Sequence, residues 1–210
     1  MSFLLWAEML VVFVLTPMSL YAVSHHLHFW LMPMLFVVGI MCLAVLLFDN
    51  QFKRGRLWNT RGLTEHVIAS VRLFVPWACL ITAGVWWFLP EHLFDLPLAH
   101  TQLWISTLLI YPIVSVLPQE IIFRTFFFHR YKNILPQRRH RWWLSSFLFG
   151  LAHLVYGNWI AVAGSWFAGL VFGYRYMQSK STLAVAFEHT LWGSFIFTVG
   201  FGAFFLTTQY

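Results

Sequence analysis

The stretch QLWISTLLIYPIVSVLPQEIIFRTFFFHR, residues 102–130, decides the fold class. It exceeds the roughly 20 apolar residues that a helix needs to cross a hydrocarbon core about 30 Å thick. Glu120 and Arg124 lie inside it, although charged side chains are costly in lipid. A helix satisfies its own backbone groups, so it is the element expected to span lipid at this length. Pro112 and Pro118 predict a kink or a break, and a break would add one helix.

The rest of the chain has the same character. Of its 210 residues, 60% are hydrophobic and only 10% are charged, compared with about 25% charged residues in soluble domains. Apolar runs are found near residues 3–22, 29–48, 68–89, 102–130, 142–156, 159–177 and 182–207. The first run lacks a basic segment before it and a clear cleavage site, so we interpret it as a span and not as a signal peptide. We therefore predict an all-α, polytopic transmembrane bundle of about seven to eight helices, forming a single integral membrane domain over residues 1–210.

The basic residues predict the orientation of the bundle. The net charge is +6, and Lys and Arg gather around residues 53–61, 130–141 and 175–180, whereas the alternate loops carry none. Because positive charge collects in cytoplasmic loops, we expect a cytoplasmic N-terminus and a bacterial inner membrane location. The basic residues separate apolar runs and form no aromatic-interleaved face, so the expected surroundings are a lipid bilayer and not nucleic acid. Segment 49–62 is expected to be a solvated loop, with an interfacial lipid-binding helix as the alternative.

Six ionisable residues fall well inside the apolar runs: Glu8, Glu120, Arg124, His153, Glu188 and His189. Such groups usually face a bundle interior or a water-filled cavity, pair with one another and mark function. At about 1.5 Å per residue, Glu120, His153 and His189 lie roughly 10–16 Å from the predicted cytoplasmic ends of three different spans. We therefore predict that these three side chains meet in a cavity open to the cytoplasm.

Purely structural interpretations of these residues remain open. Glu120 and Arg124 are four residues apart and would neutralise each other on one helix face, which also fits a pair that only packs the bundle. His153 could serve as an interhelical hydrogen bonder, since Gly150 allows a neighbouring helix to approach. Glu188 precedes His189 by one position, about 100° around a helix, so we expect it to face the cytoplasmic mouth instead.

A metal centre is a weak alternative for the same groups. His153, His189 and Glu120 are suitable zinc ligands if their helices converge, but the sequence has no HExxH or paired-cysteine motif. We therefore expect no required cofactor. Water activation needs only a carboxylate or imidazole base and hydrogen-bond donors for the oxyanion. Both interpretations predict hydrolysis within the membrane.

Three segments together resemble the CPBP family of intramembrane proteases, also called the CAAX protease and bacteriocin-processing or Abi family. Its pattern is EExxxR on one helix, FxxxH on a second and HxxxN on a third. The corresponding residues here are Gln119-Glu120 with Arg124, Phe149 with His153, and His189 with Gly193. The resemblance covers residues 105–205, which would form the catalytic core.

The resemblance implies a glutamic-type peptidase acting on a membrane-associated or lipid-modified protein or peptide. In that family the first Glu of the first motif and the His of the second motif are thought to activate water. The resemblance therefore implies that His153 activates water, that His189 donates to the oxyanion, and that no tightly held metal is needed. Prenylated CAAX tails, sorting-signal tails and bacteriocin leaders are all substrates that fit the family.

Two positions depart from the family pattern. Gln119 stands at the first Glu of the motif, and its amide can orient water but cannot accept a proton at useful pH. Gly193 stands at the Asn and provides no side-chain donor, so Ser194 or a neighbouring span would have to replace it. Glu120 could then be the base, although a paired Arg weakens carboxylate basicity, or His153 could be the base.

The same departures support a second functional class, a catalytically weakened relative that binds a membrane peptide or acts as an immunity protein. A proton-coupled or lipid carrier is a third class, indicated only by the intramembrane carboxylates.

Overall fold

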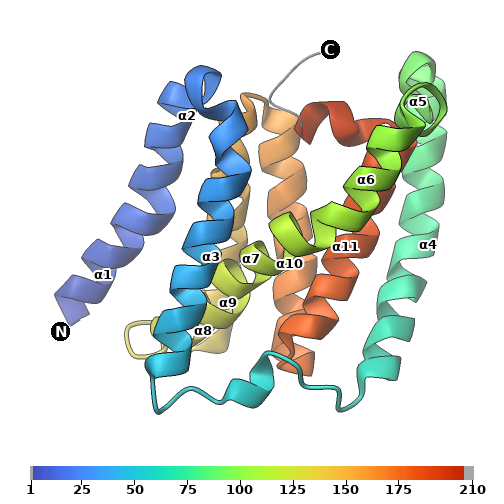
Figure 1. The fold of residues 1–210 in the computed structure, drawn as a ribbon. Helices are drawn as coiled ribbons and strands as arrows, with labels where there is room; N and C mark the ends of the chain where they lie inside the picture. The colour runs from blue at the N-terminus through green and yellow to red at the C-terminus, as the bar shows by residue number, and fades with distance from the viewer. Residues whose placement is uncertain (1, 206–210) are drawn as a thin grey trace.

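The structure, a computed structural model, describes residues 2–205, and all regular secondary structure in that range is helical (Figure 1). The helices stand side by side in one bundle. The start of the first helix, the loop at residues 49–62 and the connection at residues 131–137 all lie at its lower end in Figure 1. The basic loops thus share one end, as the charge pattern predicts, and the all-α membrane bundle is confirmed.

The elements follow in this order: α1 (Ser2–Leu10), a π-helix (Val11–Leu15), α2 (Thr16–Leu27), a 3-10 turn (His28–Trp30), α3 (Leu31–Phe48), a 3-10 turn (Arg54–Arg56), α4 (Leu63–Phe88), a 3-10 turn (Pro90–His92), α5 (Asp95–Ala99), α6 (Thr101–Tyr111), a π-helix (Pro112–Val116), α7 (Leu117–Glu120), a π-helix (Ile121–Phe126), α8 (Phe127–Arg130), α9 (Arg138–Ala152), a 3-10 turn (His153–Tyr156), α10 (Trp159–Ser179), α11 (Thr182–Val199) and a 3-10 turn (Phe201–Phe205).

Five helical runs in the described part of the chain are long and apolar enough to cross a membrane: Ser2–Ser24, Leu31–Phe48, Leu63–Phe88, Thr101–Arg130 and Thr182–Val199. The predicted spans at 142–156 and 159–177 also form helices, α9 and α10, although they lie outside this group of long apolar runs. α9 has only 15 residues and begins with basic side chains, and α10 contains Arg175 near its end. α9 nevertheless packs along α10, and α10 along α11, within the same bundle (Figure 1).

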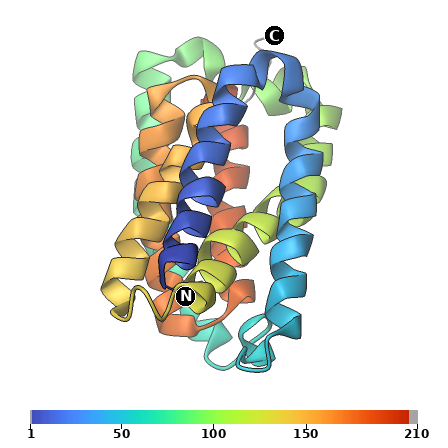
Figure 2. The ribbon, with the colours of Figure 1, turned by 90° about the vertical axis from the view of Figure 1, so that its left-hand side faces the viewer.

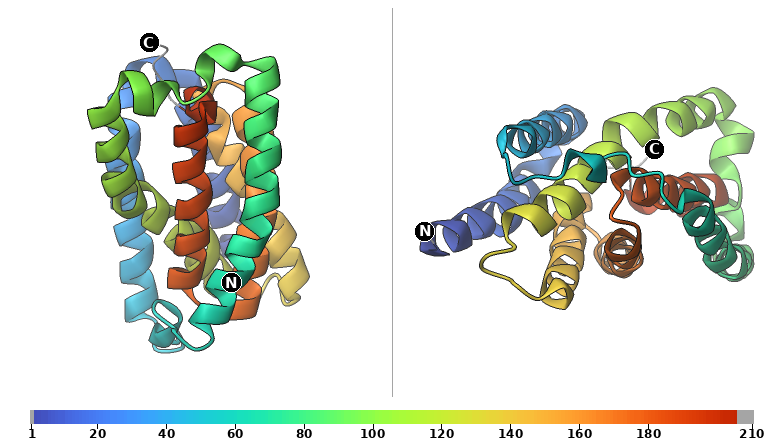
Figure 3. Two further views of the ribbon diagram at one scale, coloured as in Figure 1. Left: turned by 90° about the vertical axis from the view of Figure 1, so that its right-hand side faces the viewer. Right: turned by 90° about the horizontal axis from the view of Figure 1, so that it is seen from below.

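The run from Thr101 to Arg130 is helical throughout and does not break at its prolines. Its winding widens into π-helix at Pro112–Val116 and again at Ile121–Phe126. These wider turns absorb the prolines, so the predicted eighth helix does not arise here. The run crosses the bundle obliquely and lies between α3 and α11 when seen from below (Figure 3). It therefore carries its charged residues through the centre of the bundle.

An aromatic core surrounds the lower half of this run. The ring of Phe13, from the first helical run, packs edge-on against Phe123 at 5.4 Å and Phe127 at 5.3 Å between centroids. That first run also lies along α9 (Figure 2). α9 in turn packs closely on α10 at Gly150, where an added Cβ would lie 2.9 Å from the carbonyl oxygen of Val162. The close approach predicted at Gly150 is confirmed.

The loop at residues 49–62 is more closely packed than predicted. Phe52 and Leu57 are buried within it, and the carbonyl of Leu57 accepts a hydrogen bond from the backbone N–H of Leu183, 3.2 Å away. The Asn59 side-chain amide donates to the carbonyl of Ser179 at 2.9 Å. The loop is therefore neither fully solvated nor a separate interfacial helix, because it closes the lower end of α10 and α11.

Candidate active site

The centre of the site is a contact between Glu120, at the end of α7, and His189, in the middle of α11. Nδ1 of His189 lies 2.6 Å from Oε1 of Glu120, and the carboxylate is fully buried. The widened π-turn that follows Glu120 starts at Ile121 and leaves the carboxylate facing α11. Two of the three residues predicted to share a cavity are therefore in direct contact.

Arg124 holds the second oxygen of the same carboxylate. Its Nε lies 3.3 Å from Oε2 of Glu120, which confirms the predicted pair four residues apart. The guanidinium is fully buried and lies over the ring of Phe149, 4.5 Å from its centroid, with Phe172 at 5.8 Å. The carboxylate and the two aromatic faces lie against this charge, but none of the three guanidinium nitrogens makes a hydrogen bond within the described residues.

His153 joins the site through Phe149. The two rings are 4.7 Å apart between centroids, and the same Phe149 ring lies 5.7 Å from that of His189. Nδ1 of His153 lies 2.7 Å from the carbonyl oxygen of Phe149, one turn earlier in α9. Within residues 2–205, the other ring nitrogen of His153 has no hydrogen-bond partner, and the side chain is only partly buried. The predicted convergence of three spans is thus found, with Phe149 in contact with both imidazoles.

Gln119 lies beside this centre. Its Nε2 donates to the hydroxyl of Ser115 at 2.7 Å, while its buried Oε1 has no partner among the described residues. A buried carbonyl oxygen without a partner is costly. The amide therefore offers an acceptor, and not a base, next to Glu120.

Gly193 lies one helical turn after His189, on the same face of α11. A Cβ built on Gly193 would overlap the hydroxyl of Tyr111 and lie 2.5 Å from its Cζ. Tyr111, at the end of α6, therefore fills the volume that a side chain at 193 would need. Ser194, predicted as a substitute donor, contributes its backbone carbonyl to the hydroxyl of Thr198 at 2.7 Å, and its side chain makes no hydrogen bond within residues 2–205.

The remaining intramembrane acids are structural. Glu188 is fully buried and accepts two hydrogen bonds from Arg175 of α10, at 2.9 and 3.0 Å. The expectation that Glu188 faces the cytoplasmic mouth is wrong, because a cation on the adjacent helix takes both of its oxygens. Glu8 binds Arg130 at 2.6 and 3.0 Å, so it does bond a neighbouring helix.

The site does not fit a metal centre. No three His, Cys, Asp or Glu side chains in the described part of the chain come together closely enough to hold an ion. Glu120 turns one oxygen to His189 and the other to Arg124, and the rings of His153 and His189 each contact the Phe149 ring. The weak zinc alternative on Glu120, His153 and His189 is therefore not supported by their arrangement.

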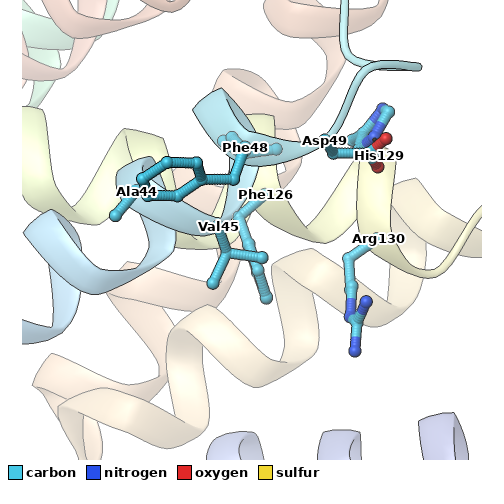
Figure 4. Close-up of a pocket in the computed structure, with 8 residues that line it drawn as sticks. Ala44, Val45, Phe48, Asp49, Phe126, His129 and Arg130 are labelled. Atoms are coloured by element: carbon cyan, nitrogen blue, oxygen red, sulfur yellow. Dashed lines mark hydrogen bonds and ion pairs between the residues drawn. The ribbon is translucent and has the colours of Figure 1, made fainter.

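A surface hollow of about 400 Å³ is separate from this site. It lies at the lower end of the bundle between α3 and α8 and includes Asp49, His129 and Arg130 (Figure 4). Nε2 of His129 is 2.7 Å from Oδ2 of Asp49, and Arg130 is bound to Glu8. Its charged groups already have partners, so it adds no candidate chemistry.

Several residues of the site escaped the sequence analysis. Ser115, Tyr111 and Phe172 are ordinary residues of apolar runs, and Arg175 falls among the basic residues at the end of a predicted span. Each acquires its role only because two helices meet. The sequence contained one signal for them. Gly193 lacks the side-chain donor of the family pattern, so a donor from another span was needed in its place.

The three motifs lie on neighbouring helices of a membrane bundle, as they would in an intramembrane protease of the CAAX type. Residues 101–195, just under half of the chain, match the family described as type II CAAX prenyl endopeptidase Rce1-like. The match confirms the resemblance of this segment to the CAAX protease family. The comparison with curated proteins found no match, and neither did the comparison with solved structures.

Proposed function

We propose that the protein is an intramembrane endopeptidase that hydrolyses a peptide bond in a membrane-associated or lipid-modified protein, with water as the nucleophile. The observation that carries the proposal is the arrangement of His153. Its Nδ1 faces the Phe149 carbonyl at 2.7 Å, and a carbonyl can only accept, so Nδ1 carries the proton. In the neutral imidazole, Nε2 then has the lone pair and can act as a general base.

Glu120 is better suited to a positioning role than to the role of base. One of its oxygens lies against Nδ1 of His189 and the other against the buried guanidinium of Arg124. Both of its oxygens are therefore already engaged within the site. Glu120 then fixes the orientation of His189 by accepting from its Nδ1–H, and the proposal uses the imidazolium form of His189, in which Nε2 also carries a proton and can donate.

The reaction proceeds in two steps that use these groups. The water oxygen forms a bond to the carbonyl carbon of the scissile peptide, one water proton passes to Nε2 of His153, and the carbonyl electron pair moves onto its oxygen. The oxyanion receives a hydrogen bond from Nε2–H of His189. The proton then passes from His153 to the peptide nitrogen, the oxyanion electron pair re-forms the carbonyl as the carbon–nitrogen bond breaks, and a carboxylic acid and an amine are released, after which the acid loses its proton to solvent. The free Oε1 of Gln119 accepts a hydrogen bond from the attacking water.

The substrate class follows from the family. Its description names a CAAX prenyl endopeptidase, and a lipid-modified tail lying at the membrane surface would reach the site from the end that carries the basic loops. A sorting-signal tail or a bacteriocin leader fits the same site. We place the protein in a bacterial inner membrane, with that end facing the cytoplasm.

The test is cleavage of a membrane-anchored peptide library by purified protein in detergent. We expect His153→Ala to lower kcat by about 10²–10⁴, the usual contribution of general acid–base catalysis, and Glu120→Gln to lower it through loss of the His189 contact. His140→Ala is the matched control, because His140 is exposed near the start of α9. Cleavage by His153→Ala at the rate of the unaltered protein would refute the proposed base.

A binding or immunity function is the second candidate, and Gln119 is the observation that favours it. An amide stands where the family pattern has a carboxylate, so the site could bind a peptide without cutting it. This candidate predicts that His153→Ala leaves the cellular phenotype intact as long as peptide binding persists. Loss of the phenotype with binding retained would exclude it.

A further inference from the structure

We propose that the hydroxyl of Tyr111 is a catalytic donor to the oxyanion, replacing the side chain that Gly193 lacks. The inference rests on the proposed hydrolytic function and adds a residue to its site. It starts from the contact already described, in which the Tyr111 hydroxyl occupies the space directly against the Cα of Gly193.

The position of the hydroxyl is the first argument. Gly193 and His189 are four residues apart, so they share one face of α11. The ring of Tyr111 stands edge-on to the ring of His189, with 6.1 Å between centroids and 77° between planes. A hydroxyl seated on Gly193 is therefore on the same face as the His189 imidazole, one turn along the helix.

The hydrogen-bonding state of the hydroxyl is the second argument. The Tyr111 side chain is only partly buried, and its hydroxyl makes no hydrogen bond within residues 2–205, so the O–H is available to a ligand. Its ring is held on two sides, by His189 and by Phe197 at 5.3 Å. The donor is thus held in place before substrate arrives, as transition-state stabilisation requires.

The match between Tyr111 and Gly193 is the third argument. Any side chain at 193 would collide with the phenol, and a small residue at 111 would leave an empty space beside a bare glycine. A pair made of Tyr at 111 and Gly at 193 therefore provides one donor, as would a small residue at 111 paired with Asn at 193. In this chain the donor comes from α6 and reaches across to α11.

The first test is the Tyr111→Phe variant, which keeps the ring and removes only the hydroxyl. We expect kcat to fall by about 10²–10³, the usual cost of removing one oxyanion donor, with KM and thermal stability nearly unchanged. Tyr174→Phe is the matched control, because Tyr174 is about half exposed on α10. An unchanged kcat, or a change confined to KM, would show that Tyr111 only fills space or binds the ground state, and either result overturns the proposal.

The second test exchanges the donor between helices. Gly193→Asn alone is expected to abolish cleavage or folding, because the new side chain meets the phenol. In the Tyr111→Ala background, Gly193→Asn is expected to raise kcat at least tenfold over Tyr111→Ala alone, and no gain would count against a shared donor position. If His153→Ala is inactive and Tyr111→Phe is fully active, only the proposed role of Tyr111 is refuted. If the unaltered protein cleaves no peptide, the proposed function is refuted, and the role of Tyr111 is refuted with it.

Discussion

The contrast between Glu188 and Glu8 gives a sharp test of how this bundle is stabilised. Glu188 is fully buried, and its two oxygens take hydrogen bonds from Arg175 at 2.9 and 3.0 Å. Replacement by Gln removes the charge and turns an N–H₂ group toward guanidinium donors, leaving a nearly buried cation without its partner. Breaking a buried ion pair in this way costs about 3–5 kcal/mol.

Glu8 provides the matched control because its pair with Arg130 is equally short but partly exposed, with 31% and 40% of the two side chains accessible. Exposed pairs contribute about 0.2–1 kcal/mol. We expect the loss of free energy of unfolding caused by Glu188→Gln to be about four times, or more, the loss caused by Glu8→Gln.

The measurement is unfolding by SDS titration in mixed micelles, followed by the signal of the intrinsic tryptophans. A double variant, Glu188→Leu with Arg175→Met, removes both charges and should recover most of the loss, because an apolar pair of similar size needs no compensation. If Glu188→Gln cost less than about 1 kcal/mol, or if the double variant were no better than the single one, the argument from burial would be refuted.

Two further predictions concern packing and pH. Gly150→Ala should lower the free energy of unfolding by about 1–3 kcal/mol, because its Cβ would meet the backbone of α10. Gly84→Ala is the control, and it should raise the free energy of unfolding by about 0.5–1 kcal/mol, because nothing lies within 4 Å of the added Cβ. Equal effects of the two substitutions in the same SDS titration would contradict this prediction. The hydrogen bond from His129, followed by one from the backbone of Gln51, holds the pKa of Asp49 below its ordinary value. Its contribution to stability is therefore present above about pH 4, the unfolded-state pKa, and is lost as the pH falls through the lowered pKa. Titrating the stability of wild type and Asp49→Asn should show the two curves converging only below about pH 4, and curves that stay parallel across that range would argue against it.

The sequence could predict those features that depend on one helix or on bulk composition. The apolar runs predicted the all-α bundle, and the four-residue spacing of Glu120 and Arg124 predicted their contact at 3.3 Å. Depth along three helices was enough to bring Glu120, His153 and His189 into one region. Rotation about each helix axis was not readable, so the sequence could not show which oxygen of Glu120 meets His189, or that Phe149 contacts both imidazoles.

The failures have the same physical origin. Glu188 was expected at the mouth because its partner, Arg175, belongs to a different helix and looked like one more basic residue near a helix end. The prolines of the fourth run predicted a kink or a break, and a local widening to π-helix at Pro112–Val116 accommodates them while the chain stays helical. In both cases tertiary packing decided between outcomes that the local sequence left equivalent.

Gly193 shows how far a departure from a motif can be interpreted without a structure. Read along one helix, a glycine in place of a donor indicates a weakened enzyme. Read across helices, the same glycine is what allows the phenol of Tyr111 to approach α11, because any Cβ there would overlap it. The number of hydrogen-bond donors in a membrane site therefore depends on the residues of all the helices that face it, and not on one motif alone. For Gln119 the reasoning differs, since its amide stays in place with an unpaired Oε1, and a hydrolytic site built this way must take its base from His153. The proposed activity would thus depend on the Nε2 of a single imidazole, which is why His153→Ala, and not a change at Gln119, is the variant that separates a peptidase from a binding protein.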